Sequence, residues 1–469
     1  MGNINSLTNI TTNQIKSSNA AQAYPASVRV FAQGIGSYST DDKVFTNPYN
    51  VGEEYGFGSP LHIIAKRLES IMASSIEVVI SPIAEPAGAT ESTGTLSLTG
   101  TQLSSKSYNL LVNNVAYGSF VIAKGDTAEQ AAAKINDYIA SANSPIESSV
   151  STADLTFTSK WKGETANQIV VEFEGSFDGI DLTTPSLTGG AGNLDYTNAL
   201  AKIGNDRVSG IITQESTSDV LDVLDAFNET RYAKNITKPF VAYHGNVDAD
   251  RTTATALTKD RNLDRTNSVT NILGSKYFTF DIAASVCEMS TRLLDSNVTK
   301  SHADQILIGL EKENIIYPDA AEREQFAQEG MVAAFEQSGK IQIAELITPY
   351  FKAEFGDNQI YRFVVDIHKM FTVYYNFRLT YEAEEMKGRA IVADGAAVSN
   401  INAIKLKTIK GITKGILEGL ASEGVIYDIN TIEVDVSLNE SNNSQVDQIV
   451  SFDLSKNLRV NNITLNVRS

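Results

Sequence analysis

The chain is poor in the residues and segments that mark several classes of protein. Its 469 residues include one cysteine, one tryptophan and four histidines. The lone cysteine, Cys287, excludes an internal disulfide and a zinc site built on several cysteines. No stretch of about 18 consecutive apolar residues occurs, so we expect no spanning helix and no membrane insertion. The first twenty residues lack an apolar core, and we therefore predict no secretory signal.

Positive charge is also scarce, which limits the partners. Lys and Arg total 38 against 56 Asp and Glu, giving a net charge of −18. Phosphate backbones attract cationic surfaces, so the chain is not expected to bind nucleic acid. Any basic patch must be local.

Catalytic signatures are missing as well. The sequence contains no G-x-S-x-G elbow, no H-E-x-x-H, no phosphate-binding P-loop and no paired C-x-x-C. The histidines are spread over separate predicted elements, which favours structural roles for them. We therefore predict a protein that is not an enzyme, with no cofactor and no metal site. If the chain were a hydrolase, its candidate residues would be Ser209, His244 and Asp248.

The first part of the chain predicts an α/β domain that follows a polar arm. Residues 1–22 are rich in Asn, Ser and Thr, with the scattered aliphatic residues Ile4, Leu7 and Ile10. Beyond them, VRVFA and IEVVISPIA are typical of buried parallel strands, and the intervening residues 60–73 have helical apolar spacing.

The pattern changes near residue 88. Residues 88–188 alternate apolar and polar side chains with period two, which predicts antiparallel strands, and one helix begins at the capping box of Thr127. Alternating helices and strands resume after residue 189, so a β-rich module is inserted in the α/β domain. This module is expected to face outward and to be dispensable. The alternative is an integral layer, with Trp161 as a packing anchor.

Residues 322–469 predict an α+β domain. The segments EREQFAQEGMVAAFEQSG and IQIAELITPYF are expected to be helical, and so is the long segment YRFVVDIHKMFTVYYNFRLTYEAEEMKG. Strands are expected near the end, the last of them through Leu458, Val460, Ile463, Leu465 and Val467. That strand pairs either with a neighbouring copy or within its own domain.

One predicted helix, residues 402–421, carries a basic stripe. At about 100° per residue, Lys407, Lys410 and Lys414 fall within a narrow arc, beside an apolar face. Lys405 lies on the apolar side and is expected to have another role. The stripe is either a contact surface or an ordinary solvated face.

Four segments, in the same order, resemble the contractile tail sheath family, particularly its Mu-like branch. The segments are GFGSPLHIIAKRL with IEVVISP, the module from GATESTGTLSLTGT to LTFTSKWKGETANQI, SLTGGAGNLDYTNALAKI, and EREQFAQEGMVAAFEQSGKIQIAELITPY. They cover most of the chain. The family's usual Pro-Gly-Val-like entry is replaced by YPASVRVF.

The resemblance implies a fold that is α/β and α+β multidomain. Its parts would be an arm (1–22), a discontinuous subtilisin-like α/β domain (23–87 and 189–321), an outer module (88–188) and an inner domain (322–469). The name subtilisin-like describes the fold alone.

The resemblance also implies a structural subunit of a virion tail or headless injection machine, made in the host bacterial cytoplasm. Its expected partners are further copies in stacked rings of a helical sheath, a tail tube protein, and baseplate and tail terminator proteins. The lysine stripe would face the tube, and both terminal segments would connect neighbouring copies. The alternatives are a hydrolase on a subtilisin-like scaffold and another virion component, such as a baseplate or capsid protein.

Overall fold

The computed structural model describes residues 21–457, except 176–177, 185, 352–358, 385, 401 and 443. Two compact units divide the chain. One comprises Pro25–Ile367, and the other joins the N-terminal residues up to Tyr24 with His368 onward. The fold is thus mixed α/β with several domains, as predicted.

A nine-stranded sheet forms the centre of the larger unit, in the order β13-β15-β14-β12-β11-β10-β1-β3-β2. The six strands from β14 to β3 run parallel, and β2, β13 and β15 add antiparallel edges. The bounds are β1 Ser27–Ala32, β2 Lys43–Val44, β3 Glu77–Pro82, β10 Gly210–Thr213, β11 Val241–Asn246, β12 Asn267–Asn271, β13 Ile306–Glu311, β14 Val332–Gln337 and β15 Lys340–Ile343.

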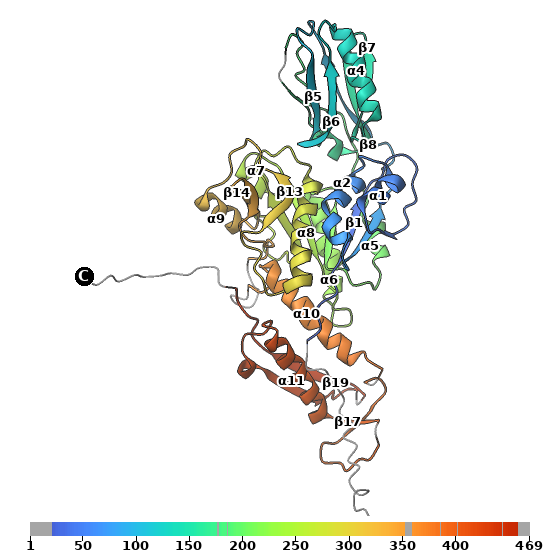
Figure 1. Ribbon diagram of the computed structural model, residues 1–469. Helices are drawn as coiled ribbons and strands as arrows, with labels where there is room; N and C mark the ends of the chain where they lie inside the picture. Colours follow the sequence, from blue (N-terminus) through green and yellow to red (C-terminus); the bar gives the residue numbers. More distant parts are fainter. Residues whose placement is uncertain are drawn as a thin grey trace, which may run out of the picture. The chain divides into compact units, whose positions relative to one another are not determined.

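Helices cover both faces of this sheet (Figure 1). They are α1 Pro48–Tyr55, α2 Pro60–Arg67, α3 Glu69–Met72, α5 Thr197–Lys202, α6 Ser218–Arg231, α7 Arg251–Thr255, α8 Thr279–Asn297 and α9 Ala320–Gln328. On one face Phe31, Ile211 and Ala242 pack against α5 and α6. On the other face α8 packs on β10 and β11. It lies so close that a Cβ on Gly245 would come within 2.1 Å of the Thr279 carbonyl oxygen.

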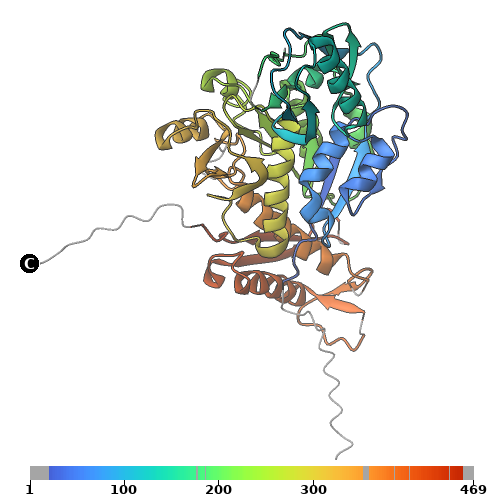
Figure 2. The same cartoon turned by 45° about the horizontal axis from the view of Figure 1, so that its top comes forward.

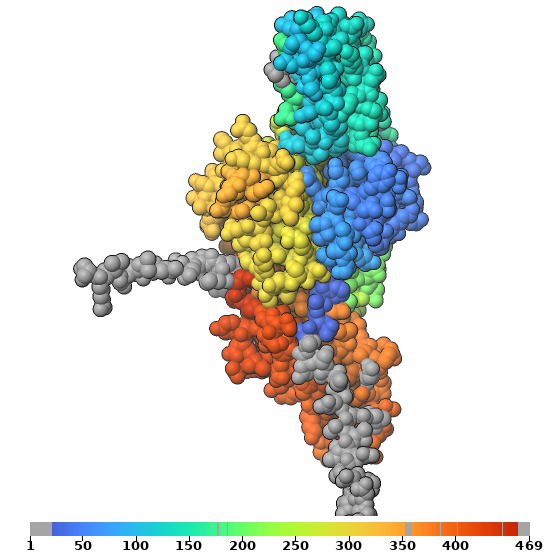
Figure 3. Space-filling model, in the orientation of Figure 1, coloured from blue at the N-terminus to red at the C-terminus, as the bar shows by residue number. Residues whose placement is uncertain are grey.

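The inserted module forms a lobe of its own (Figure 3). It contains the sheets β4-β8-β7 and β6-β5-β9 and the helix α4. Its entry and exit are paired, because Thr90 bridges Ala191 and Thr93 bridges Thr188. The bounds are β4 Glu91–Ser97, β5 Lys106–Val112, β6 Val115–Ile122, α4 Ala128–Ser141, β7 Ile146–Ser151, β8 Asp154–Lys162, the short 3₁₀ turn Glu164–Gln168 and β9 Val171–Glu174.

The second unit is built around the long helix α10. Its hairpin β18-β19 packs against α11, and the two lie side by side in both views (Figure 1, Figure 2). The bounds are α10 Val364–Tyr381, which begins in the larger unit, β16 Ala390–Val392, β17 Ala403–Lys405, α11 Leu406–Ser422, the 3₁₀ turn Ile429–Thr431, β18 Glu433–Leu438 and β19 Val446–Ser451. Helix α10 confirms the helical prediction for this β-branched and aromatic segment.

Two predictions for the region after residue 322 need correction. VAAFEQ and KIQI are strands of one hairpin and not helices, because Ser338 (φ 54°) and Gly339 (φ 79°) form a two-residue turn between them. Strand β14 also pairs in parallel with β12 of the large sheet. The predicted boundary at residue 322 therefore falls inside the α/β unit, which extends to Ile367.

Candidate functional site

The basic stripe lies on α11, an amphipathic helix. Its inward side buries Ile409, Leu417 and Leu420. The Lys407, Lys410 and Lys414 side chains are exposed. In the part of the chain that the structure describes, no carboxylate lies within ion-pair distance of their ammonium groups. Among the described residues, the stripe is therefore an exposed cationic surface without an acidic partner.

Two neighbours of the stripe refine it. Glu418 is exposed and lies on the same face by helical geometry, so the stripe carries one negative charge that sequence reasoning missed. Lys405, by contrast, donates from its Nζ to the Ala396 carbonyl oxygen at 2.6 Å. It braces the preceding loop. Lys405 is the last residue of β17 and the N-cap of α11, so it lies on no face of the helix, and the prediction that began this helix near residue 402 was wrong at that end.

A buried polar contact holds α11 in place. The Thr413 side chain is fully buried and lies 2.6 Å from Tyr381 Oη on α10. It also donates to Gln448 Oε1 on β19 at 2.5 Å. Sequence reasoning did not find this contact, because a lone Thr inside an apolar helical face carries no pattern. It fixes the direction in which the lysine stripe points.

The residues assigned to terminal connectors lie outside the described residues. These are Ile4, Leu7 and Ile10 of the N-terminal arm and Leu458, Val460, Ile463, Leu465 and Val467 of the last predicted strand.

The three hydrolase candidates do not form a catalytic group. Ser209 Oγ donates to the Ser27 carbonyl oxygen at 2.6 Å. Asp248 Oδ2 accepts from the side-chain Nδ2 of Asn246 at 2.8 Å. His244 is fully buried, with its Nε2 2.9 Å from Asn267 Oδ1. No hydrogen bond joins any two of the three candidates within the described chain.

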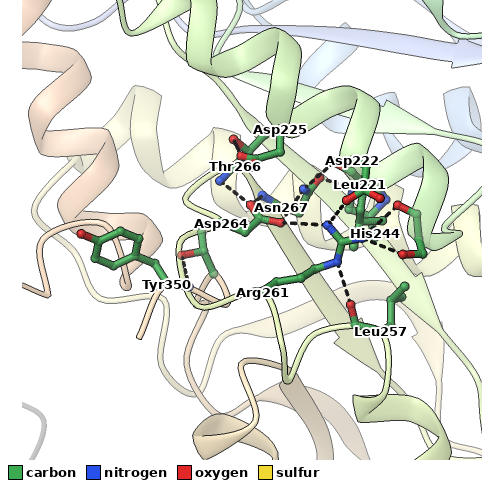
Figure 4. Close-up of polar contacts among 12 residues, drawn as sticks. Leu221, Asp222, Asp225, His244, Leu257, Arg261, Asp264, Thr266, Asn267 and Tyr350 are labelled. Carbon is green, nitrogen blue, oxygen red and sulfur yellow. Dashed lines mark hydrogen bonds and ion pairs between the residues drawn. The ribbon is translucent and has the colours of Figure 1, made fainter. Parts of the chain in front are cut away.

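His244 belongs instead to a polar network between α6 and the start of β12 (Figure 4). Asn267 donates from its side chain to Asp264 Oδ2 at 2.7 Å and to the Leu221 carbonyl oxygen at 3.0 Å. Burial lowers the pKa of His244 to about 4, so the ring is neutral at physiological pH. Burial and the nearby Asp225 carboxylate raise the pKa of Asp264. These groups satisfy one another and form a structural core.

The base of the inserted module is anchored to the α/β domain. Trp161 is 2% exposed and lies edge-on to Phe278, with ring centroids 5.7 Å apart. Its Nε1 donates to Thr165 Oγ1, which also accepts from the Gln214 amide at 2.7 Å. Trp161 thus packs between layers, as the integral-layer alternative predicts.

The described residues offer no group of three or more His, Cys, Asp or Glu side chains able to hold a metal ion. Within that same part of the chain, no helix is both long enough and apolar enough to cross a membrane.

Comparisons with known proteins support the resemblance to tail sheath proteins. No family model matches the chain. It is 26% identical over 178 residues to the Mu-like prophage FluMu tail sheath protein of Haemophilus influenzae. This match covers 37% of the chain and 36% of the relative, so it spans about a third of either protein.

Solved structures share the fold over nearly the whole chain. The sheath tail protein of Desulfitobacterium hafniense matches with a TM-score of 0.50 and 11% identity, over 92% of this chain and 97% of that one. The helical sheath of the anti-feeding prophage in the contracted state matches with a TM-score of 0.51 and 8% identity, over 96% and 94% of the two chains. A chain of the anti-feeding prophage baseplate in the contracted state matches with a TM-score of 0.51 and 10% identity, over 98% of this chain and 98% of that one. At these identities the likeness shows a common fold.

Proposed function

We propose that this chain is the structural subunit of a contractile tail sheath, which polymerises around a tail tube and contracts to drive the tube through a target envelope. The match to the FluMu tail sheath protein carries the proposal, because it is a likeness in sequence to a protein that is named a tail sheath. The whole-chain fold likeness to a helical sheath supports it. We place the subunit in the tail of a phage or headless injection machine, assembled in the host bacterial cytoplasm.

Its partners follow from this role. Further copies would stack as rings into a helical sheath, with the baseplate and tail terminator proteins at its two ends. The solved neighbours from a helical sheath and a baseplate support an oligomeric assembly. The terminal segments, residues 1–22 and 458–469, would connect the copies. The parallel sheet with helices on both faces suits the subtilisin-like domain, and residues 88–188 would form the outer module.

The tube contact is assigned to α11. Three exposed lysines without a described acidic partner are the kind of surface that an acidic tube exterior would complement. Such a contact is modest and screened by salt, which suits a tube that must be held and then released. Glu418 reduces the stripe's charge, so the contact is weaker than three lysines alone would give.

A hydrolase has less support. Ser209, His244 and Asp248 are each engaged with other residues, and His244 is shut away from solvent. A baseplate component has the support of one fold neighbour. Negative-stain images of the purified chain, alone and with its tube protein, separate these functions. Long hollow tubes are expected for a sheath, whereas discrete particles or peptidase turnover lost on substitution of Ser209 would contradict it.

A further inference from the structure

Helix α10 holds the first described residues of the chain. Asn376 Oδ1 accepts from the Gln22 backbone N–H at 2.8 Å, and Asn376 Nδ2 donates to the Gln22 carbonyl oxygen at 2.9 Å. The two bonds satisfy both backbone groups of Gln22, as a neighbouring strand would. Two residues later, the Tyr24 ring packs against Phe371 and Tyr375, with centroids 5.6 and 5.9 Å away.

The same helix holds the last described residues. The Lys369 side chain is fully buried, and its Nζ donates to the Ser455 carbonyl oxygen at 2.7 Å and to Asn457 Oδ1 at 3.0 Å. A buried ammonium is costly unless such acceptors compensate its lost hydration. Lys369 therefore ties the segment after β19 to α10, immediately before the final twelve residues, 458–469.

Lys369 and Asn376 lie seven residues apart, which is almost two helical turns, so both point to one side of α10. Their separation along the axis is roughly 10 Å. The first and last described segments are thus tied to one face of one helix, although Gln22 and Asn376 are 354 positions apart in the sequence.

We infer that Lys369 and Asn376 are positioning residues that fix where the two terminal segments leave the subunit. The inference rests on the proposed function, in which these segments connect neighbouring copies. A connecting segment sets the spacing between neighbouring copies only when the residues from which it leaves the subunit are held in place. If those residues can move, the neighbouring copy can move with them. Helix α10 would then transfer a pull on one terminal segment to the other through a single rigid element.

Hydrogen exchange on the purified full-length subunit tests the anchoring. Asn376→Ala is expected to speed exchange around Gln22 at least tenfold and to leave residues 455–457 unchanged. Lys369→Met should have the reverse pattern. Leu379→Ala, an exposed substitution on the same helix, is the matched control. If Lys369→Met does not fold, Asn457→Ala takes its place in the experiment, because it removes one of the two acceptors of the Lys369 ammonium.

Tube assembly then tests the role. Asn376→Ala and Lys369→Met, or Asn457→Ala in place of the latter, are expected to give fewer and shorter tubes with blurred layer lines in their diffraction patterns. Leu379→Ala is expected to assemble normally. Unchanged exchange, or wild-type layer lines despite lost protection, would overturn the inference and leave the sheath function standing. If the wild-type chain forms no tubes, the proposed function fails and the lattice role with it, whereas the exchange data still decide the anchoring.

Discussion

Tyr381 Oη on α10 lies 2.6 Å from Thr413 Oγ1 on α11, and this contact joins the elements of the C-terminal unit. Tyr381 Oη also lies 3.2 Å from the Ile409 carbonyl oxygen. Thr413 continues the chain of hydrogen bonds to Gln448 on β19. Burial raises the pKa of Tyr381, so its hydroxyl keeps its proton across the physiological range. These contacts fix the rotation of α11 about its own axis. They therefore fix the direction in which Lys407, Lys410 and Lys414 point.

Thr413→Val should destabilise the C-terminal unit. It keeps the volume of the side chain but removes the two hydrogen bonds that Thr413 Oγ1 makes with Tyr381 Oη and Gln448 Oε1. The expected loss is about 1 to 3 kcal/mol. Urea unfolding of the full chain measures it, with Thr408→Val on the exposed side of α11 as the control for β-branching. Equal stability of the two variants would mean that the contact contributes nothing.

The sequence predicted the regular elements well and the polar contacts poorly. The capping box at Thr127 begins α4 as expected, and IEVVISP is a buried parallel strand paired with β1. Periodicity reports which side chains face a core, so such elements can be predicted. The hairpin at Ser338 and Gly339 was missed because its buried strand, VAAFEQ, lacks alternation and suits a helix equally well.

Long-range polar pairs leave no such signal. The contacts of Lys369 with Ser455 and of Asn376 with Gln22 join residues 86 and 354 positions apart. A lysine in an apolar helical segment looks like a solvated position until the fold supplies its acceptors. The lysine stripe was predictable because its three residues share one helix, and its Glu418 neighbour could have been found by the same helical spacing.

Trp161→Ala should destabilise the larger unit strongly. Trp161 fills the space between the module base and the aromatic pair Phe278 and Phe280, whose rings stack 4.7 Å apart. Removing such a buried ring costs about 3 to 5 kcal/mol. Circular dichroism during urea unfolding measures the loss, and Trp161→Phe should recover part of it.

The same contact bears on excision of the module. Joining Glu85 to Gly190 through a short linker would remove Trp161 and expose Phe278. We expect this variant to lose its cooperative unfolding transition, as an integral module base requires. A cooperative transition of wild-type steepness would show that the module is dispensable for the core.

Glu215 should make stability depend on pH. It is 4% exposed, and burial raises its pKa to about 7, although the Leu194 backbone N–H opposes the shift. The folded protein therefore keeps this carboxyl protonated at pH values where the unfolded chain, with a pKa of about 4.3, has released the proton. Stability should fall as the pH rises from about 4.3 to about 7 and then level off.

Glu215→Gln tests this assignment. The amide oxygen can still accept from Leu194, so the variant should unfold with a flatter pH profile and gain stability above pH 7 relative to the wild type. Free energies of unfolding at several pH values provide the measurement. A parallel profile for the two proteins would show that another group titrates in this range.

Reversing the charge of the lysine stripe should separate folding from tube attachment. Lys407→Glu, Lys410→Glu and Lys414→Glu together replace attraction to an acidic tube by repulsion. All three side chains are exposed, so the subunit should fold normally. Binding to tube should fall roughly tenfold or more. Electron microscopy should then show empty, contracted-like tubes and no extended sheath on tube, and raising the ionic strength should weaken wild-type attachment in the same direction.

The change in net charge must be excluded as the cause of lost attachment to the tube. Each Lys→Glu change alters the charge by two, so the triple variant moves the chain from −18 to −24. The control is a second triple variant, Lys234→Glu, Lys259→Glu and Lys300→Glu, which makes the same change in net charge. These three lysines are exposed and belong to the larger unit, away from α11. If attachment depends on the stripe, this control forms extended sheath on tube and the α11 variant does not, while Glu418→Gln strengthens attachment. Loss in both triple variants would assign the effect to overall charge, and extended sheath in both would place the tube contact on another surface.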